Sequence, residues 1–443
     1  MGVEIANRMN FSYLPDSKDL LLHLKDFVSA SVPDLEVIET VSAILKDIRE
    51  GGDKALLEKT QLYDQATLLP AEIPLNQTEL DDAEAKLNAS ERASIEEAIR
   101  NVQLFHEKSM PADWSAINEH GAEVGEKHYP IKRVGIYVPG GNVPLVSTVI
   151  MTVTLAKVAG VSEIAVVTPP GPNGKVAFQL LGALKALGVS EVYRVGGAQA
   201  IGALAYGTES IPAVDKIYGP GNAYVNEAKR QAFGTVGIDL LPGPSEVMVI
   251  ADETANPAFI SAALLAQAEH GSGKEKIYLL FTEETLFPKV VKELEAQVQT
   301  LSHKEAIEKV LECGFRSVFL PELARVSEVA NFIAPEHLEL QVSEDNLTFL
   351  TKEISTAGAF LMGHSTATSL GDFAAGPSHV LPTGRSARFS SGLKLNDFFR
   401  RTSFIRYDEV AAKKALPVVS EFALMEQLDA HGRSLSMRVT KDD

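Results

Sequence analysis

Two polar side chains three residues apart raise the question of what chemistry this sequence can perform. The stretch "LLAQAEHGSG" (residues 264–273) carries Gln267 and His270 in a run of small and apolar residues that breaks on glycine. On a helix this spacing puts both side chains on one face, one turn apart. The segment is therefore either a polar helix end or a pair of metal ligands, and the spacing alone leaves both interpretations open.

Further residues able to bind a metal or move protons occur in three short motifs. They are Glu336 and His337 in "APEHL", Asp372 and His379 in "GDFAAGPSHVLP", and Glu426 and His431 in "EQLDAHG". Each alone has an ordinary explanation, because histidines favour helix ends and aspartates favour turns and caps. Together, histidine, aspartate and amide side chains form a mixed nitrogen and oxygen set that suits zinc, although glutamine is an uncommon zinc ligand.

Glycine-rich turns follow several runs of β-branched residues. They are Pro139-Gly140-Gly141, Gly196-Gly197 and Gly219-Pro220-Gly221-Asn222. In open α/β sheets ligands bind beyond the carboxyl ends of the strands, where glycine lets the backbone approach a phosphate and the next helix offers free N–H groups. No complete G-x-G-x-x-G or P-loop motif is present. Any one turn is more simply a tight strand–helix connection, so the turns alone indicate nucleotide binding only weakly.

The composition limits the classes of protein to which the chain can belong. It has 443 residues, 45% of them apolar, and a net charge of −18 from 59 acidic and 41 basic residues. This length predicts two or three domains, and the absence of a long basic cluster argues against nucleic-acid binding. The single cysteine, Cys313, gives no sign of an oxidising compartment. Prolines and glycines interrupt the longest uncharged run, 134–156, so we expect a cytoplasmic protein without a membrane span.

The order of elements predicts two α/β units. Residues 35–64 and 78–108 have the pattern of amphipathic helices. From Val134 onward, short β-branched runs alternate with helical stretches, first to about residue 250 and again from helix 256–270 to the strand "AGAFLMG". This alternation is typical of parallel sheets covered by helices on both faces. The last segment, from about residue 390, has a predicted helix at 409–430 and a short strand, "SLSMRV", and a tail of this kind often docks on a partner.

Several longer motifs resemble the histidinol dehydrogenase family. They run in the family's order from about residue 134 to the end of the chain. They are "VGIYVPGGNVPLVSTV", "VGGAQAIGALAYGTESIPAVDKIYGPGNAYVNEAKR", "GPSEVMVIAD", "AQAEHG", "APEHLELQ", "GDFAAGPSHVLPTG" and "LDAHG". The resemblance implies NAD-linked oxidation of L-histidinol to L-histidine through the aldehyde, the last steps of histidine biosynthesis, in an enzyme that contains zinc.

The resemblance also assigns roles to individual residues. It implies zinc ligands at Gln267, His270, Asp372 and His431, and a catalytic pair at Glu336 and His337. It implies that Ser245, His379 and Glu426 bind the substrate together with these ligands and the pair, and that Tyr137, Gln199 and Asn222 contact NAD. Members of the family are homodimers in which the C-terminal tail crosses over, so His431 and Glu426 would complete the partner's site.

We therefore expect an α/β protein with two Rossmann-like, doubly wound parallel-sheet domains, an N-terminal helical segment and a C-terminal tail that crosses a dimer. The expected boundaries are 1–32 for the helical segment, 33–136 with 247–390 for the metal and catalytic domain, 137–246 for the NAD domain, and 391–443 for the tail.

Two other functions remain open. Relatives with this fold oxidise other small alcohols, such as dihydroxypropanesulfonate, but Glu426 would repel an anionic sulfonate, so Glu426 and His379 favour histidinol. A regulatory protein that binds metal and nucleotide without catalysis would be expected to have lost Glu336 or His337, and both are present.

Overall fold

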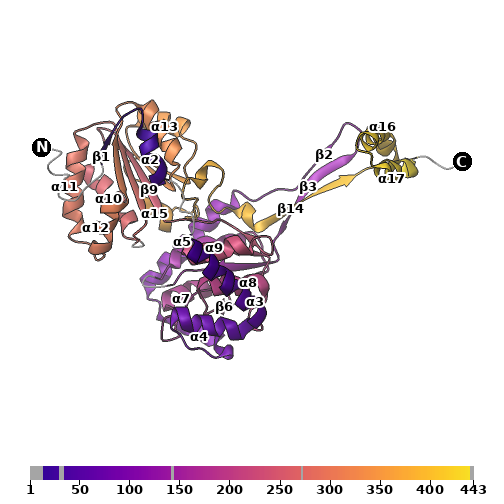
Figure 1. Cartoon of the computed structure of the whole chain (residues 1–443), viewed down its shortest axis with the longest axis horizontal. Coiled ribbons are helices and arrows are strands. Elements are labelled where there is room, and N and C mark those ends of the chain that lie inside the picture. Colours follow the sequence, from indigo (N-terminus) through magenta and orange to yellow (C-terminus); the bar gives the residue numbers. More distant parts are fainter. Residues whose placement is uncertain (1–12, 29–33, 141–143, 271–272, 440–443) are drawn as a thin grey trace.

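The computed structural model of the chain describes residues 13–28, 34–140, 144–270 and 273–439. It has two α/β lobes and an arm that extends away from them (Figure 1). The predicted α/β class with parallel sheets is thereby confirmed. None of the helices in these ranges is long and apolar enough to span a membrane.

The larger lobe contains a six-stranded sheet in which every pair of neighbours is parallel, in the order β1-β11-β10-β9-β12-β13. Its strands are β1 (Tyr13–Pro15), β9 (Glu246–Ala251), β10 (Lys276–Phe281), β11 (Phe315–Phe319), β12 (His337–Gln341) and β13 (Ala359–Met362). Side chains alternate between the two faces of a strand, and in β9 both faces are apolar. Val247 and Val249 lie in one core and Met248 and Ile250 in the other, so helices must cover both faces.

Three helices pack on each face of this sheet. The helices α10 (Pro257–Ala268), α11 (Leu286–Val298) and α12 (Lys304–Cys313) cover one face, and α2 (Leu20–Val28), α13 (Leu323–Ile333) and α14 (Glu344–Glu353) cover the other. A short helix, α15 (Thr368–Phe373), follows β13. The described part of the predicted N-terminal segment, residues 13–28, is therefore not a separate helical unit. β1 extends the sheet, and Leu20, Leu24 and Val28 of α2 are buried in its core.

The smaller lobe contains a five-stranded parallel sheet in the order β6-β5-β4-β7-β8. Its strands are β4 (Arg133–Tyr137), β5 (Glu163–Val167), β6 (Glu191–Tyr193), β7 (Lys216–Tyr218) and β8 (Gly237–Ile238). The helices that alternate with them are α6 (Val146–Val158), α7 (Phe178–Ala186), α8 (Gly197–Tyr206) and α9 (Ala223–Ala232). The chain passes from β4 to β5 and β6 on one side and then returns to β7 on the other, which places a topological switch point between β4 and β7.

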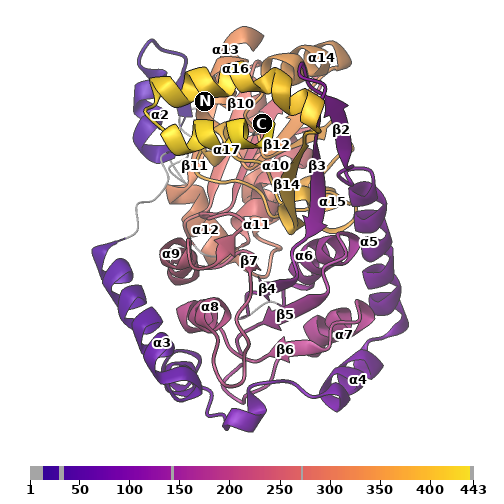
Figure 2. The same cartoon turned by 90° about the vertical axis from the view of Figure 1, so that its right-hand side faces the viewer.

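The helices between residues 35 and 107 belong to this smaller lobe. They are α3 (Leu35–Asp64), α4 (Gln77–Lys86) and α5 (Ala89–Glu107), with a 3-10 turn, η1 (Pro70–Glu72), between α3 and α4. They curve round the outside of the smaller lobe (Figure 2). The prediction that residues 33–136 share a domain with 247–390 is therefore wrong. The apolar stripe of α3, including Val41 and Ile48, packs with α8 and α9, while α4 and α5 pack with α7 and α6.

The arm is built from two distant parts of the chain. The strands β2 (Trp114–Ile117), β3 (Glu123–Pro130) and β14 (Phe399–Arg406) form an antiparallel ribbon in the order β14-β3-β2. Helices α16 (Glu409–Met425) and α17 (Asp429–Val439) pack together at its far end (Figure 1). The predicted strand "SLSMRV" instead lies inside α17. Its alternating pattern suggests a strand, but the segment continues the helix that begins at Asp429.

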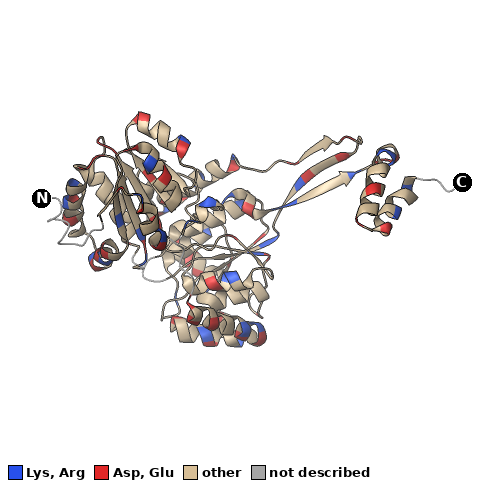
Figure 3. Cartoon of the chain, turned by 45° about the horizontal axis from the view of Figure 1, so that its top comes forward, with Lys and Arg blue, Asp and Glu red and all other residues tan. Residues whose placement is uncertain are grey.

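Two further short elements join the arm to the lobes. They are the 3-10 turns η2 (Ser386–Arg388) and η3 (Leu395–Phe398). Phe398 of η3 stacks on Tyr218 of β7 with the ring centroids 4.1 Å apart, which fixes the base of the arm on the smaller lobe. Acidic and basic residues are mixed over both lobes and the arm (Figure 3).

Candidate active site

Six of the predicted site residues meet at the amino-terminal edge of the larger sheet. Glu336 and His337 stand at the start of β12, Gln267 and His270 at the end of α10, and Asp372 and His379 at and after the end of α15. Helices in a βαβ unit run antiparallel to the strands, so the ends of α10 and α15 reach the edge where β9 and β12 begin. We call these six residues the polar cluster.

The Glu336–His337 pair is the buried centre of the polar cluster. The backbone N–H of Glu246 donates to Glu336 Oε2 at 2.7 Å, and His337 Nδ1 donates to the Glu246 carbonyl at 3.3 Å. His337 Nε2 lies 3.3 Å from Asp372 Oδ1. Burial raises the pKa of Glu336 to about 7, against the opposing effect of His337. Burial disfavours the charged form of His337, but the carboxylates of Glu336 and Asp372 outweigh it and raise its pKa.

Asp372 links the remaining members of the cluster. Its backbone carbonyl accepts a hydrogen bond from His379 Nδ1 at 3.0 Å. Burial acts to raise the pKa of the Asp372 carboxyl, but the hydrogen bond from His337 and the nearby positive charges of His379 and His270 lower it below its usual value. His270 is exposed, so this side of the cluster is open to a ligand.

The donor atoms of the cluster fit a zinc ion in part. Gln267 is buried, and its Nε2 atom has no hydrogen-bond partner among the described residues. Because α10 contacts α15, this amide, His270 and Asp372 supply oxygen and nitrogen donors from one region. Within the part of the chain that the structure describes, no three His, Cys, Asp or Glu side chains are arranged to hold a metal. The three predicted ligands of the larger lobe therefore fit zinc only with at least one further donor.

Three predicted substrate- or metal-binding residues remain: Ser245 lies beside the polar cluster, and Glu426 and His431 do not. Ser245 directly precedes β9 and is half-buried, next to the residue whose backbone holds the catalytic pair. Glu426 and His431 lie at the far end of the arm, where α16 meets α17. They line a hollow of about 390 Å³ together with apolar residues such as Phe422. The structure therefore does not bring Glu426 and His431 to the polar cluster of their own chain.

The three predicted NAD residues lie at the carboxyl edge of the smaller sheet. Tyr137 ends β4, and its hydroxyl accepts a hydrogen bond from the Gly197 N–H at 3.3 Å. Gln199 in the first turn of α8 donates from Nε2 to Asp64 Oδ2 at 3.2 Å. Asn222 caps α9 and accepts from the N–H groups of the two residues Tyr224 and Val225. Each residue is thus beside a glycine turn, but Gly141 of the first turn lies outside the described residues.

The switch point between β4 and β7 requires glycine. Gly219 has a φ of 108°, and a Cβ atom there would stand 2.0 Å from the Tyr137 carbonyl oxygen. A fully buried ion pair, Lys229–Asp239, contacts this turn. Asp239 Oδ2 accepts from the Gly219 N–H at 2.7 Å, and Lys229 Nζ donates to the Gly219 carbonyl at 3.0 Å. Both polar groups of Gly219 are therefore fixed by side chains, which leaves the following turn in a defined position.

Four functional or supporting residues were missed by sequence reasoning. They are Glu246, Asp64, Lys229 and Asp239. Burial raises the pKa of Asp64, the partner of Gln199, to about 6. Lys229 and Glu246 lie inside motifs quoted above. The only sequence signal for them was a charged residue within an otherwise buried helix or strand. Asp64 ends α3, which sequence reasoning assigned to the other lobe.

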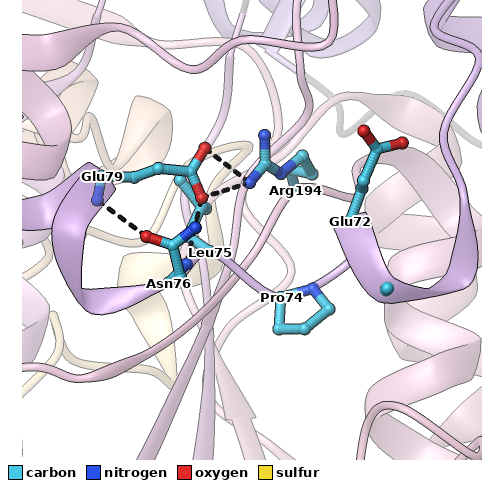
Figure 4. Close-up of a pocket in the computed structure, with 7 residues that line it drawn as sticks. Glu72, Pro74, Leu75, Asn76, Glu79 and Arg194 are labelled. Carbon is cyan, nitrogen blue, oxygen red and sulfur yellow. Dashed lines mark hydrogen bonds and ion pairs between the residues drawn. The ribbon is translucent and has the colours of Figure 1, made fainter.

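A separate hollow of about 270 Å³ opens beside α4 (Figure 4). Glu72, Pro74 and Asn76 line it together with Arg194, which follows β6. Arg194 Nη2 is 2.8 and 2.6 Å from the two carboxylate oxygens of Glu79, so its charge is neutralised within the wall. None of the predicted site residues lines this hollow.

Comparisons with known proteins agree on one family. The histidinol dehydrogenase family profile matches residues 29–439. The chain is 42% identical over 412 residues to the histidinol dehydrogenase of Nitrosospira multiformis, covering 92% of each chain, and 41% identical over 427 residues to that of Pseudomonas fluorescens, covering 96% of each. The crystal structure of histidinol dehydrogenase from Elizabethkingia anophelis superposes with a TM-score of 0.91 at 34% identity, over 97% of this chain and 98% of that one.

Proposed function

The chain belongs to the histidinol dehydrogenase family, an oxidoreductase of histidine biosynthesis, and on that premise we propose its reaction in detail. The protein oxidises L-histidinol to L-histidine in the cytoplasm through L-histidinaldehyde, in two steps that each reduce one NAD, with zinc at the site. The observation that carries this proposal is the polar cluster, in which separate segments bring His337, Glu336 and Asp372 into one half-buried site.

His337 is proposed to accept the proton of the alcohol in the first step. Its Nδ1 atom donates to the Glu246 carbonyl, so Nε2 is the nitrogen that remains to take a proton, on the side where Asp372 lies. NAD, when bound, would supply the acceptor for the carbinol hydride, and His337 takes the O–H proton. The negative charge of Asp372 contributes to the raised pKa of His337 and so favours the protonated ring. A cation bound at Asp372 would lower this pKa and leave more of the ring unprotonated, which is the form that accepts a proton.

Glu336 is proposed to activate water in the second step. A carboxyl group with a pKa of about 7 is partly ionised at neutral pH, as a general base requires. It removes a proton from the water that adds to the aldehyde, and a second NAD, when bound, would accept the hydride of the resulting hydrate. The chain's single cysteine, Cys313, is exposed at the end of α12 and is not one of the six residues of the polar cluster. Direct hydration therefore fits this site better than a thiol adduct.

Zinc is proposed to bind Gln267, His270 and Asp372 of one chain and His431 of a second copy. When bound, the ion would hold the imidazole and amino nitrogens of histidinol and so orient the carbinol carbon. Gln267 would bind the ion through its amide oxygen Oε1, and its position at the buried end of α10, three residues before His270, supports this assignment. Ser245, His379 and, from the second copy, Glu426 are proposed to bind the substrate, and the Glu426 carboxylate suits a cationic amino alcohol.

A homodimer with exchanged arms is proposed because two separate surfaces expose large apolar side chains. On the arm, Phe422, Leu424 and Met425 are more than half exposed. Near the polar cluster, Phe373 of α15 and Phe389 are also exposed. Exposed aromatic and aliphatic groups gathered in this way are typical of protein contact surfaces. An arm seated on the partner's larger lobe would cover both surfaces and carry His431 and Glu426 to the partner's cluster.

NAD is proposed to bind at the carboxyl edge of the smaller sheet, over the switch point between β4 and β7. Tyr137, Gln199 and Asn222 lie at the glycine turns on this edge, and α8 begins there just after Gly196, without a side-chain cap. The free N–H groups of such a helix start, with glycines that permit close approach, favour a bound pyrophosphate.

The reaction is tested with purified protein, zinc, NAD and L-histidinol. Two NADH should form for each histidinol consumed, with little free aldehyde released, and dihydroxypropanesulfonate should not be oxidised. A stoichiometry of one, or turnover with the sulfonate alone, would overturn the assignment of substrate and reaction.

A further inference from the structure

Glu246 is a buried carboxyl group with no role in the reaction described above. It is the first residue of β9 and is 2% exposed. Its neighbours across the sheet are Lys276 in β10 and the catalytic strand β12. A carboxyl group is seldom placed at such depth without a specific partner, because removing it from water is costly. The contacts of Glu246 show what it holds in place.

The backbone of Glu246 holds both catalytic residues. Its N–H donates to Glu336 Oε2 at 2.7 Å, and its carbonyl accepts from His337 Nδ1 at 3.3 Å. One peptide unit on each side of a single Cα atom therefore sets the direction of the Glu336 carboxylate and of the His337 ring. A shift of Glu246 would move both side chains together.

The side chain of Glu246 holds a second segment, the turn at residues 383–386. Glu246 Oε2 accepts a hydrogen bond from the Gly384 N–H at 3.2 Å. Thr383 Oγ1 accepts another from the Gly243 N–H, so the turn is fastened at two points to the segment that precedes β9. Arg385 has a positive φ of 67°, which is unfavourable for a residue other than glycine and persists only where surrounding contacts fix it.

We propose that Glu246 is a positioning residue that couples the 383–386 turn to the catalytic pair. Its carboxyl group fixes the turn, and through the same residue's backbone the turn keeps Glu336 and His337 in their working directions. This inference rests on the proposed roles of that pair. It also gives a role to the loop "TGRSARFSSG", whose first residues form the turn and which leads from His379 toward the arm.

The charge state of Glu246 determines which substitution preserves the contact. Burial raises its pKa to about 8, with Lys276 opposing the rise and Glu336 adding to it. A carboxyl group that is largely neutral can be replaced by an amide of the same shape, whose oxygen still accepts from Gly384. The Glu246→Gln variant should therefore keep the activity of the native enzyme, while the Glu246→Ala variant should lose it.

The test compares rates, not only stability. In Glu246→Ala, oxidation of the aldehyde should slow on the order of 100-fold, because small misplacements of catalytic groups have effects of that size. The KM for NAD should stay unchanged, since the NAD turns belong to the other sheet. Glu246→Asp, which draws the carboxyl back by one methylene, should show a partial loss and serves if the alanine variant does not fold.

Asp252 supplies a matched control at the opposite end of the same strand. It is fully buried and accepts hydrogen bonds from Thr254, Ser343 and Asn346. Asp252→Ala should lower thermal stability as Glu246→Ala does but leave the rates of both steps near those of the native enzyme. If the two variants lose activity in parallel with stability, Glu246 is only structural and the proposal is wrong.

Two further measurements separate this proposal from the proposed function. If Glu246 acts through Glu336, adding Glu246→Ala to Glu336→Gln should cost much less in aldehyde oxidation than Glu246→Ala alone. Fully additive losses would overturn the coupling. Amide hydrogen exchange at Gly384 should accelerate in Glu246→Ala whatever reaction the enzyme catalyses. Unchanged exchange would refute the contact, whereas a native enzyme that leaves histidinol unoxidised would refute the function instead.

Discussion

Removing His270 from one copy of the chain and His431 from another separates the two halves of the proposed zinc site. His270 stands just after α10 and His431 lies in α17. Figure 1 shows α10 in the larger lobe and α17 at the far end of the arm. If arms are exchanged in a dimer, each site takes His270 from one subunit and His431 from the other. Each variant alone should then lose zinc and activity, because all its sites carry the same defect.

The expected recovery in a mixture follows from this geometry. In a dimer of one His270→Ala and one His431→Ala subunit, one site carries both defects and the other carries neither. Random exchange of equal amounts makes half of the dimers mixed, and half of the sites in those dimers are intact. The mixture should therefore reach about one quarter of the native activity per chain, whereas a site built within one chain would recover none.

The assay measures NADH formation at saturating histidinol and NAD after subunit exchange has been verified with differently tagged chains. A mixture of Gln267→Ala with His270→Ala is the matched control. Both residues lie on α10 or at its end, so every site in that mixed dimer keeps one defect and no activity should return. Verified exchange without recovery in the first mixture would show that the crossed-arm arrangement is wrong.

Three other outcomes are expected. Glu336→Gln should slow aldehyde oxidation more than alcohol oxidation. In the native enzyme the rate of aldehyde oxidation should fall as the pH drops below about 7, the pKa of Glu336. An equal loss of rate in both steps of the variant would contradict the separate roles of Glu336 and His337. Lys229→Met leaves the buried carboxylate of Asp239 without its partner, so the free energy of unfolding in urea should fall by about 3–5 kcal/mol. The KM for NAD should rise more than the KM for histidinol. An unchanged KM for NAD would show that the ion pair does not support the cofactor turn. His106 is buried, and its ring nitrogens have no hydrogen-bond partner among the described residues. Burial lowers the pKa of His106 to about 4, so the stability present above pH 6.5 is lost as the pH falls toward 4, by about 3 kcal/mol at most. In His106→Leu, the free energy of unfolding measured in urea at several pH values should fall less over this range. An unaltered dependence of that free energy on pH would contradict the prediction.

The sequence predicted local structure well because local structure depends on nearby residues. Short β-branched runs and glycine turns predicted most strands of both sheets, although not β1 or β8, and the run that carries Gln267 was predicted to be helical, as observed. The lobe to which residues 35–107 belong could not be predicted in the same way. The apolar stripe of α3 shows that the helix is covered on one side, but not which of two similar α/β units covers it.

The arm shows the same limit more strongly. Its ribbon pairs β3 with β14, residues more than 260 positions apart, such as Gly125 with Phe404. Such a pairing has no signal in either segment alone. The period-two alternation of "SLSMRV" predicted a strand, but a tertiary contact between α16 and α17 favours the helix.

For the site, motifs identified the residues, and only the fold explains their grouping. Glu336 and His337 are neighbours in sequence, yet their contact with Asp372 depends on β12 and α15 meeting at the same edge of the sheet. Glu246 was not predicted because a glutamate at the start of a strand resembles an ordinary solvated end. Its burial becomes visible only when β10 and β12 flank it.

The predicted site residues lie at opposite edges of the two sheets. The polar cluster lies at the amino edge of the larger sheet and the glycine turns at the carboxyl edge of the smaller one. The loop after α15 connects these regions. Asn101 of α5 donates to the Ala374 carbonyl at 2.9 Å, and a Cβ atom on Gly376 would stand 2.6 Å from the Asn101 carbonyl oxygen. Glycine therefore lets the loop that carries His379 lie directly against the smaller lobe. Because this contact is made by a backbone that admits no side chain at Gly376, the position of His379 in the polar cluster depends on the smaller lobe as well as on the larger one.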